Sequence, residues 1–300
     1  MPRLFERDQV EASAPSHGRI VLVPTPLGNL GDLTLRALET LRAADVIACE
    51  DTRVTRKLLS HFGIAGKPLH AYHEHNARVA GPKLVAMAAA GRMVAVVTDA
   101  GMPGVSDPGS ALVNLAREAG VALDLLPGPC AFVSGAVLSG FPVAGLRFGG
   151  FLPRAAGERL AALRAAADAE GASAWYESPQ RIGQSLRDAE RAGVTRCFLL
   201  REYTKLHEQR IVGTPGEVLA ALPDPVRGEV VLVVEGHGAE PKAAPEGAEI
   251  DARIDALIST GAGVSAIART LAAEGLGDRR ELYARAVRRK GEGGAAPPRD

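Results

Sequence analysis

The sequence predicts an α/β fold built around a mostly parallel sheet. Three observations predict it: short apolar runs alternate with segments of helical periodicity, each apolar run ends near glycine or proline, and 46% of the 300 residues are hydrophobic. Such alternation is typical of strand–helix–strand units in which helices cover both faces of the sheet. A chain of this length and hydrophobic content can bury a core of that kind.

The first half of the chain contains predicted strands separated by predicted helices. The strands are Ile20–Val23, Val46–Cys49, Val94–Val97 and Leu123–Leu126. The helices are Thr34–Ala43, Thr55–Phe62, Lys83–Ala90 and Ser110–Ala119, with Asp32 as the expected N-cap of the first. Right-handed crossovers place the loops that follow these strands at one edge of the sheet, where ligands bind in open α/β sheets.

The pattern starts again after Pro127-Gly128-Pro129, a turn that ends the fourth strand. The later helices are Ala131–Leu138 and Glu158–Glu170, and the later strands are Arg147–Phe151, Ala174–Glu177, Cys197–Arg201, Gln209–Gly213 and Val230–Glu235. The last strand is apolar on both faces, which predicts a central position. We therefore expect α/β domains at residues 18–127 and 128–237, a helical appendage at 250–288, a disordered leader at 1–17 and a disordered tail at 291–300.

Charge and cysteine content restrict the function classes only weakly. The chain has no apolar run of membrane-spanning length. Its 35 basic and 35 acidic residues balance, so net charge neither indicates nor excludes a nucleic-acid partner. Cys49, Cys130 and Cys197 lie far apart in apolar surroundings, which predicts buried thiols in a reducing cytoplasm. No metal site is expected, because His73-Glu74-His75 lacks helical ligand spacing and a third ligand.

Three loops at the predicted sheet edge carry the chemistry-bearing residues. They are Pro24–Thr34, Cys49–Arg53, and the glycine- and proline-rich Thr98–Gly109. The first two have structural alternatives, a rigid turn for the first and helix capping by Asp51 or Thr52 for the second. Their common position after parallel strands favours a ligand site, because bare backbone can approach a ligand closely there.

Taken together and in order, the motifs identify a family resemblance. They are VPTPLGNLGDLT at 23–34, CEDTR at 49–53, HFGI at 61–64, TDAGMPGVSDPG at 98–109, PGPCA at 127–131, GFLPR at 150–154, YESPQR at 176–181, RE-TK at 201–205 and GEVVLVVEG at 228–236. Over residues 18–286 the chain resembles the ribosomal small-subunit RNA methyltransferase I family of the tetrapyrrole methylase superfamily. Thr98 and Met102 depart from its pattern, since Ser and Thr are expected there.

The resemblance implies two consecutive α/β domains of the tetrapyrrole methylase type, with S-adenosylmethionine bound in the cleft between them. It implies 2′-O-methylation of a cytidine ribose in the decoding region of 16S ribosomal RNA, by a cytoplasmic homodimer acting on the small ribosomal subunit. The cofactor-binding residues it implies are Pro24, Thr25, Pro26, Gly28, Asp99, Ala100, Gly101, Pro103, Ser106, Asp107, Pro127, Gly128, Pro129, Tyr176, Gly213, Thr214, Pro215, Glu229, Val230 and Val231.

A ribose hydroxyl reacts poorly until its proton leaves, so a nearby acceptor would help. The candidates are Glu50, Asp51, His73 and Glu74, with Lys205 as an electrostatic aid. The alternative is that no dedicated general base exists and that positioning of the ribose hydroxyl alone suffices. Expected RNA contacts are Arg53, Arg56, Lys57, Arg78, Arg181, Arg201, Arg279 and Arg280. A small-molecule or protein acceptor, or a non-catalytic assembly factor, remain rival functions because fold does not fix substrate.

Overall fold

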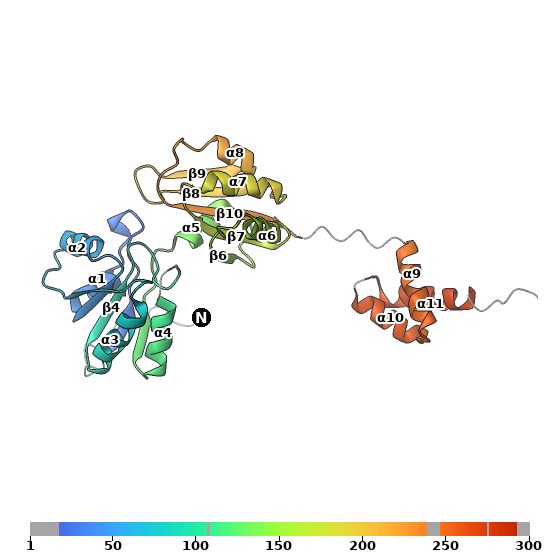
Figure 1. The fold of residues 1–300 in the computed structure, drawn as a ribbon, viewed down its shortest axis with the longest axis horizontal. Helices are drawn as coiled ribbons and strands as arrows, with labels where there is room; N and C mark the ends of the chain where they lie inside the picture. Colours follow the sequence, from blue (N-terminus) through green and yellow to red (C-terminus); the bar gives the residue numbers. More distant parts are fainter. Residues whose placement is uncertain (1–17, 107–108, 239–246, 275, 293–300) are drawn as a thin grey trace, which may run out of the picture. The chain divides into compact units, whose positions relative to one another are not determined.

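The computed structural model describes residues 18–106, 109–238, 247–274 and 276–292 (Figure 1). The described residues form two compact units, one within residues 18–167 and 171–236 and the other within residues 168–170 and 237–292. The predicted leader, Asp107 and residues 293–300 of the predicted tail lie outside the described residues. In the described part of the chain, no helix is long and apolar enough to cross a membrane.

The first sheet is fully parallel, as the sequence predicts. Its order is β3-β2-β4-β1-β5, and it comprises β1 (Arg19–Leu22), β2 (Val46–Cys49), β3 (Leu69–Ala71), β4 (Met93–Val97) and β5 (Ala122–Leu125). The carboxyl ends of these strands therefore lie at one edge. Strand β3 was not predicted, because its three residues, Leu-His-Ala, form an edge strand that is only partly buried and lacks an apolar run.

Helices cover both faces of this sheet. They are α1 (Leu35–Ala43), α2 (Thr52–His61), α3 (Ala77–Ala89) and α4 (Gly109–Glu118). Leu41 of α1 and Leu59 of α2 pack with Ile47 on one face. Leu84 of α3 and Leu112 of α4 pack on the other. The expected cap at Asp32 is wrong, because Asp32 ends a 3₁₀ turn, η1 (Leu30–Asp32), and the Thr34 side chain accepts from the Ala37 amide to cap α1.

The second sheet is mixed, with the order β6-β7-β10-β8-β9. Its strands are β6 (Arg147–Phe151), β7 (Glu170–Glu177), β8 (Cys197–Arg201), β9 (Gln209–Gly213) and β10 (Val230–His237). β10 lies in the middle, which confirms the position predicted from its two apolar faces. β6 runs parallel to β7, whereas β8 is antiparallel to both β10 and β9. The loop of residues 202–208 is too short for a parallel crossover, so β8 and β9 form a hairpin.

Helices also pack on both faces of the second sheet. They are α5 (Ala131–Ser139), α6 (Ala156–Ala167), α7 (Ile182–Arg191) and α8 (Pro215–Ala220). The sequence-based extension of α6 to Glu170 is wrong, because β7 begins at that residue. Gly171 has φ +80°, and a Cβ there would lie 2.2 Å from the Ala144 carbonyl oxygen. The alanine-rich composition of this segment favours helix, but α6 ends at Ala167 and Gly171 is held in β7 by this tight backbone contact.

The C-terminal unit contains α9 (Gly247–Ser259), α10 (Val264–Ala273) and α11 (Arg279–Glu292). Its core includes Ile254, Ile267, Leu271 and Leu282. α11 continues through residues 291 and 292, which the sequence assigned to the disordered tail. The basic run of α11 is partly neutralised by α9, since Arg285 pairs with Asp251 and Arg289 with Asp255.

Candidate functional site

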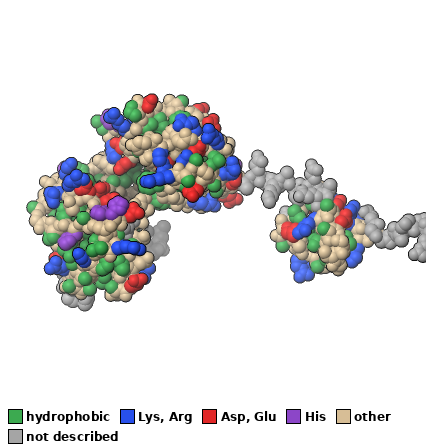
Figure 2. Space-filling view, viewed as in Figure 1, with side chains coloured by type: hydrophobic (Ala, Val, Ile, Leu, Met, Phe, Trp, Pro, Cys, Tyr) green, Lys and Arg blue, Asp and Glu red, His purple; other side chains and the backbone are tan. Residues whose placement is uncertain are grey.

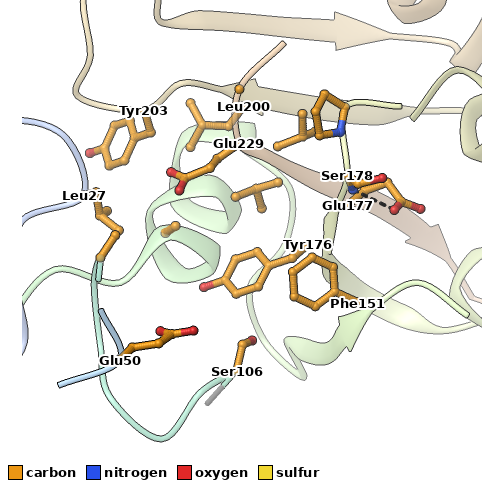
Figure 3. Close-up of a pocket in the computed structure, with 16 residues that line it drawn as sticks. Leu27, Glu50, Ser106, Phe151, Tyr176, Glu177, Ser178, Leu200, Tyr203 and Glu229 are labelled. Atoms are coloured by element: carbon orange, nitrogen blue, oxygen red, sulfur yellow. Dashed lines mark hydrogen bonds between the residues drawn. The ribbon is translucent and has the colours of Figure 1, made fainter. Parts of the chain in front are cut away.

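A cavity of about 450 Å³ lies at the carboxyl edge of the first sheet and is closed by the second, a size that suits a small-molecule ligand. Figure 3 shows Leu27, Glu50 and Ser106 reaching it from the loops of the first sheet. From the second half come Ala131, Phe151, Tyr176, Glu177, Ser178, Pro179, Leu200, Tyr203, Gly228, Glu229, Val230 and Val231, while Ala100 completes the first side. The walls are mostly apolar, with carboxylates at opposite sides.

The loops after β1 and β4 are tied together at this edge. Thr25 and Gly101 exchange two backbone hydrogen bonds of 3.0 Å, and the buried Thr25 hydroxyl donates to the Thr98 carbonyl at 3.2 Å. Gly101 adopts φ +80°, which glycine tolerates without a Cβ clash. The turn after β5 packs against them, because a Cβ at Gly128 would lie 2.5 Å from Pro24 Cβ. Bare backbone therefore forms much of this rim.

Asp51 and Asp99 join the loops after β2 and β4. The Asp51 side chain caps α2, and its backbone amide donates to Asp99 Oδ1 at 3.0 Å. The Arg53 guanidinium, 2.6 Å from Asp51 Oδ2, holds the pKa of Asp51 at about 2 through hydrogen bonds. A carboxylate with so low a pKa is a weak proton acceptor. Burial raises the pKa of Asp99 above its ordinary value.

Most of the implied cofactor residues lie at this edge. Ala100, Ser106, Tyr176, Glu229, Val230 and Val231 line the cavity itself. Gly101 lines an adjoining hollow of 100 Å³. Thr25, Pro26, Gly28 and Asp99 line a further hollow of 270 Å³, which shares Leu27 with the cavity. Pro103, Pro127 and Pro129 belong to the same loops but line none of these three spaces.

Three implied cofactor residues lie elsewhere. Gly213 ends β9, and its register partner is Cys197, the first residue of β8. The cavity lies at the other end of β8, beside Leu200. Thr214 and Pro215 instead begin α8, where the Thr214 side chain accepts from the Glu217 amide. The hairpin direction therefore places these residues at the opposite edge of the second sheet, and the structure does not bring them to the cavity.

Among the candidate proton acceptors, Glu50 lines the cavity, and its carboxylate extends toward the same space as the Tyr176 ring (Figure 3). His73 and Glu74 follow β3, which is separated from β4 by β2, and they do not line the cavity. The His73 amide donates to Asn76 Oδ1 at 2.9 Å in a local turn. The geometry therefore favours Glu50 over His73, Glu74 and the weakly basic Asp51.

The residues expected to contact RNA differ in accessibility. Arg201 is 8% exposed, and its guanidinium donates to Gln209, Arg227 and His207. Arg181 donates to the Leu152 carbonyl and to the buried Glu177 carboxylate. These bonds stabilise loops and do not favour an RNA contact. The exposed members are Arg53, Arg56, Lys57 and Arg78, with Arg279 and Arg280 in the C-terminal unit.

Basic and acidic side chains are interspersed on the face shown in Figure 2, as the balanced composition suggests. A phosphate contact on this face therefore depends on individual exposed arginines and lysines more than on a broad basic patch.

Sequence reasoning missed several cavity residues, notably Leu27, Phe151 and Tyr203. Leu27 and Tyr203 stand inside the motifs that carry the resemblance, yet their apolar bodies are typical of core residues. Burial raises the pKa of Tyr176 to about 12, so its hydroxyl stays protonated and can donate a hydrogen bond near neutrality. Thr98, which differs from the serine expected in the family pattern, has a structural role, because its hydroxyl lies 3.3 Å from the carbonyls of Ala100 and Gly101.

Two substitutions of Asp99 test whether ligand affinity depends on its hydrogen bond to the Asp51 amide or on its charge. Asp99→Ala removes the acceptor for the Asp51 amide, so we expect ligand affinity at the cavity to fall at least tenfold, about 1.4 kcal/mol. Asp99→Asn retains an acceptor oxygen and should lose much less. Calorimetric titration with S-adenosylmethionine, the methyl donor that the resemblance implies, measures both variants. Equal losses would mean that the charge of Asp99, not its loop-joining bond, supports binding.

Comparison with known proteins agrees with this geometry. Residues 19–219 match the family model described as Tetrapyrrole (Corrin/Porphyrin) Methylases. The chain is 44% identical over 241 residues to the ribosomal RNA small subunit methyltransferase I of Mesorhizobium japonicum, covering 79% of this chain and 81% of that protein. Identity to the Escherichia coli O157:H7 protein of the same name is 42% over 243 residues, covering 79% and 84%.

Two solved structures share the fold. A diphthine synthase matches with a TM-score of 0.59 at 16% identity, covering 74% of this chain and 92% of that one. A uroporphyrin III C-methyl transferase from Thermus thermophilus matches with a TM-score of 0.52 at 20% identity, covering 73% and 97%. The expected fold class is therefore confirmed, and identities this low carry no conclusion about substrate.

Proposed function

This chain belongs to the tetrapyrrole methylase family and to the ribosomal RNA small subunit methyltransferase I family within it, and we propose that it methylates the 2′-hydroxyl of a cytidine ribose in the decoding region of 16S ribosomal RNA. The family relation makes it a methyltransferase enzyme. The single observation that carries the proposal is the cavity where the loops after β1, β2 and β4 face the second sheet.

The proposed methyl donor is S-adenosylmethionine, and the residues present fit it. Its sulfonium is a cation, which the carboxylates of Glu50 and Glu229 favour electrostatically in a cavity with apolar walls. Phe151 and Tyr176 supply aromatic surface, and their rings lie 5.7 Å apart. The rim built on Thr25 and Gly101 offers backbone groups without intervening side chains. When bound, this donor supplies an electrophilic methyl group.

The chain's own residues then orient the acceptor and exclude water. Leu27, Leu200 and Val231 form apolar walls that shield the transfer. Glu50 is the proposed acceptor of the hydroxyl proton, since it lines the cavity and Asp51 is held weakly basic by Arg53. Tyr176 stays protonated, and its hydroxyl orients the acceptor by donating a hydrogen bond. Glu50 would take up the proton of the acceptor hydroxyl as its oxygen receives the donor's methyl group, with the carbon–sulfur electron pair staying on sulfur.

The proposed partner is the small ribosomal subunit. Arg56 and Lys57 on α2, with Arg78 on α3, are exposed basic residues near the carboxyl edge of the first sheet and supply phosphate contacts. A homodimer is supported by apolar residues left exposed at the edge strand β5 and on α5, among them Leu125 at 50% and Val137 at 65%. Free Cys49, Cys130 and Cys197 suit a reducing cytoplasm.

Labelled methyl transfer tests the proposal. The purified chain is incubated with methyl-labelled donor and either unmethylated small subunits, naked 16S RNA or a free porphyrinoid. We expect label in the RNA of the subunits. The labelled RNA should resist alkaline cleavage at one cytidine, because a methylated 2′-oxygen cannot attack the neighbouring phosphate. Binding to subunits should weaken steeply as salt rises. Label in the porphyrinoid alone, or on a base instead of a ribose, would refute the proposed acceptor.

A further inference from the structure

The loop of residues 202–208, which joins β8 and β9, is held in an unusual conformation beside the cavity. Glu202 has φ 50° and Thr204 has φ 64°, the two non-glycine residues with positive φ in the described part of the chain. Such conformations carry backbone strain and persist where surrounding contacts impose them. Tyr203, between them, lines the cavity. Several contacts of this loop involve Lys205.

Two carboxylates hold the Lys205 ammonium. Its Nζ lies 2.9 Å from Glu202 Oε1 and 3.0 Å from Glu229 Oε2. The Glu229 amide also donates to Glu202 Oε1 at 3.0 Å, which fixes the first carboxylate. Glycine at 228 makes room for it, because a Cβ there would lie 2.3 Å from Glu202 Oε1. Glu229 itself lines the cavity and Lys205 does not, so the bond to this carboxylate is what places the Lys205 ammonium next to the cavity.

The loop after β1 holds the lysine from the other side. The Asn29 amide donates to the Thr204 hydroxyl at 3.1 Å. A Cβ at Gly28 would lie 2.3 Å from Lys205 Cγ, so the lysine stem crosses this glycine in contact with its backbone. Gly28 lines the 270 Å³ hollow, whereas Glu229 lines the cavity. Lys205 therefore stands where these two spaces meet, between the first and second sheets.

The Lys205 ammonium stays protonated, and its two carboxylate partners use two of its three N–H donors. Partial burial acts to lower the pKa of Lys205, but the hydrogen bonds to Glu202 and Glu229 outweigh it and raise the pKa. Lys205 is therefore a cation across the neutral range and no general base. An ammonium carries three N–H donors, and the two carboxylates accept two of them. Its side chain is 28% exposed, so the residue is only partly buried by these contacts.

We propose that Lys205 is a catalytic residue whose third N–H donates to the acceptor ribose 2′-oxygen, and that Glu202 is the residue that positions it. The ammonium stabilises negative charge as it develops on that oxygen. In the balanced step, the 2′-O–H proton passes to Glu50, the oxygen forms a bond to the methyl carbon, and the carbon–sulfur electron pair stays on sulfur. Lys205 keeps its proton throughout. This inference rests on the proposed ribose acceptor.

Single-turnover methylation of small subunits at saturating donor tests the proposal. Lys205→Met should lower the rate constant 10²- to 10³-fold, the loss typical of removing one such donor, with donor affinity changed by less than threefold. Lys205→Arg should retain more activity than Lys205→Met, because the charge remains. Lys205→Ala should regain activity when small alkylamines are added, in proportion to their concentration. Glu202→Gln should lower the rate constant less than Lys205→Met does.

A pH profile distinguishes catalysis from loop support. Without the ammonium the acceptor hydroxyl is harder to ionise, so the rising limb of the rate profile should move to higher pH in Lys205→Met. Arg196→Met is the matched control, because it breaks an exposed ion pair with Glu235 at the other end of β8. It should leave rate and profile unchanged.

The outcomes separate this inference from the proposed function. No methylation of subunits by the wild-type chain would refute the proposed function itself. Wild-type activity with a Lys205→Met rate within threefold of it would overturn the role of Lys205. A lowered rate with an unshifted pH profile, no amine rescue and a lowered melting temperature would also overturn it, leaving only structural support of the loop.

Discussion

Gly101→Val is expected to abolish uptake of the methyl donor while leaving the chain folded. Gly101 has φ +80°, which a β-branched residue adopts only with strain of about 1–3 kcal/mol. Its Cβ would also lie 2.9 Å from Leu27 Cδ2, in the wall of the cavity. Relief of that strain requires the paired loops of Thr25 and Gly101 to separate. Calorimetry should show affinity for S-adenosylmethionine reduced at least a hundredfold.

Gly120→Val is the matched control for this substitution. Gly120 has a similar φ of +65° in the turn after α4, and a Cβ there would meet no atom within 4 Å. Its variant therefore carries comparable backbone strain away from the cavity. We expect Gly120→Val to lower the melting temperature but to bind the donor as the wild type does. Normal donor affinity in Gly101→Val would show that the rim of Thr25 and Gly101 takes no part in binding.

The strands were largely predictable because burial on both faces leaves a signature in the sequence. The runs that became β1, β2, β4 and β10 are nearly all apolar, so residue type alone indicates a covered strand. β3 carries no such signature, since it is an edge strand of three residues. The end of α6 was misjudged because helix propensity is a local quantity, whereas the contact of Gly171 with Ala144 is set by tertiary packing.

The site was predictable only as a set of loops. Parallel strands must bring their following loops to one edge, so Glu50, Asp99 and Ala100 could be placed near a ligand from topology. Gly213 was misplaced although the sequence held the needed information, because the short loop after β8 requires an antiparallel return. The partners of Arg201 and Lys205 could not be read from sequence, since Arg227 and Glu229 pair with them through folding.

Arg159→Met is expected to destabilise the α/β unit by about 3 kcal/mol, because it leaves a buried carboxylate without its main counter-ion. Arg159 is 6% exposed, and its Nε and Nη2 donate to Asp188 Oδ2 at 2.9 and 2.6 Å. Asp188 is 4% exposed, so water cannot replace those bonds without opening the core. Urea unfolding followed by the fluorescence of Trp175, the single tryptophan and part of the same core, measures the loss.

Arg191→Met is the matched control, because Arg191 contacts the same carboxylate at 3.4 Å but is 70% exposed. It should cost less than about 1 kcal/mol, as exposed pairs do. The two variants should also differ in their response to pH. Burial acts to raise the pKa of Asp188, but hydrogen bonds from Arg159 and Gln184 outweigh it and hold the pKa below its ordinary value.

The stability supplied by Asp188 is therefore complete above the unfolded pKa of about 4 and is lost as the pH falls through the lower folded pKa. In Arg159→Met the bonds from Arg159 are gone and only Gln184 and Arg191 still donate, so burial raises that pKa relative to wild type and protonation relieves the buried charge. The difference between wild type and Arg159→Met should thus be largest near pH 7 and shrink as the pH falls through the raised pKa of the variant and then through the lower pKa of the wild type. A difference that stays constant across this range would mean that lost packing of the arginine stem, not the carboxylate's charge, sets the cost.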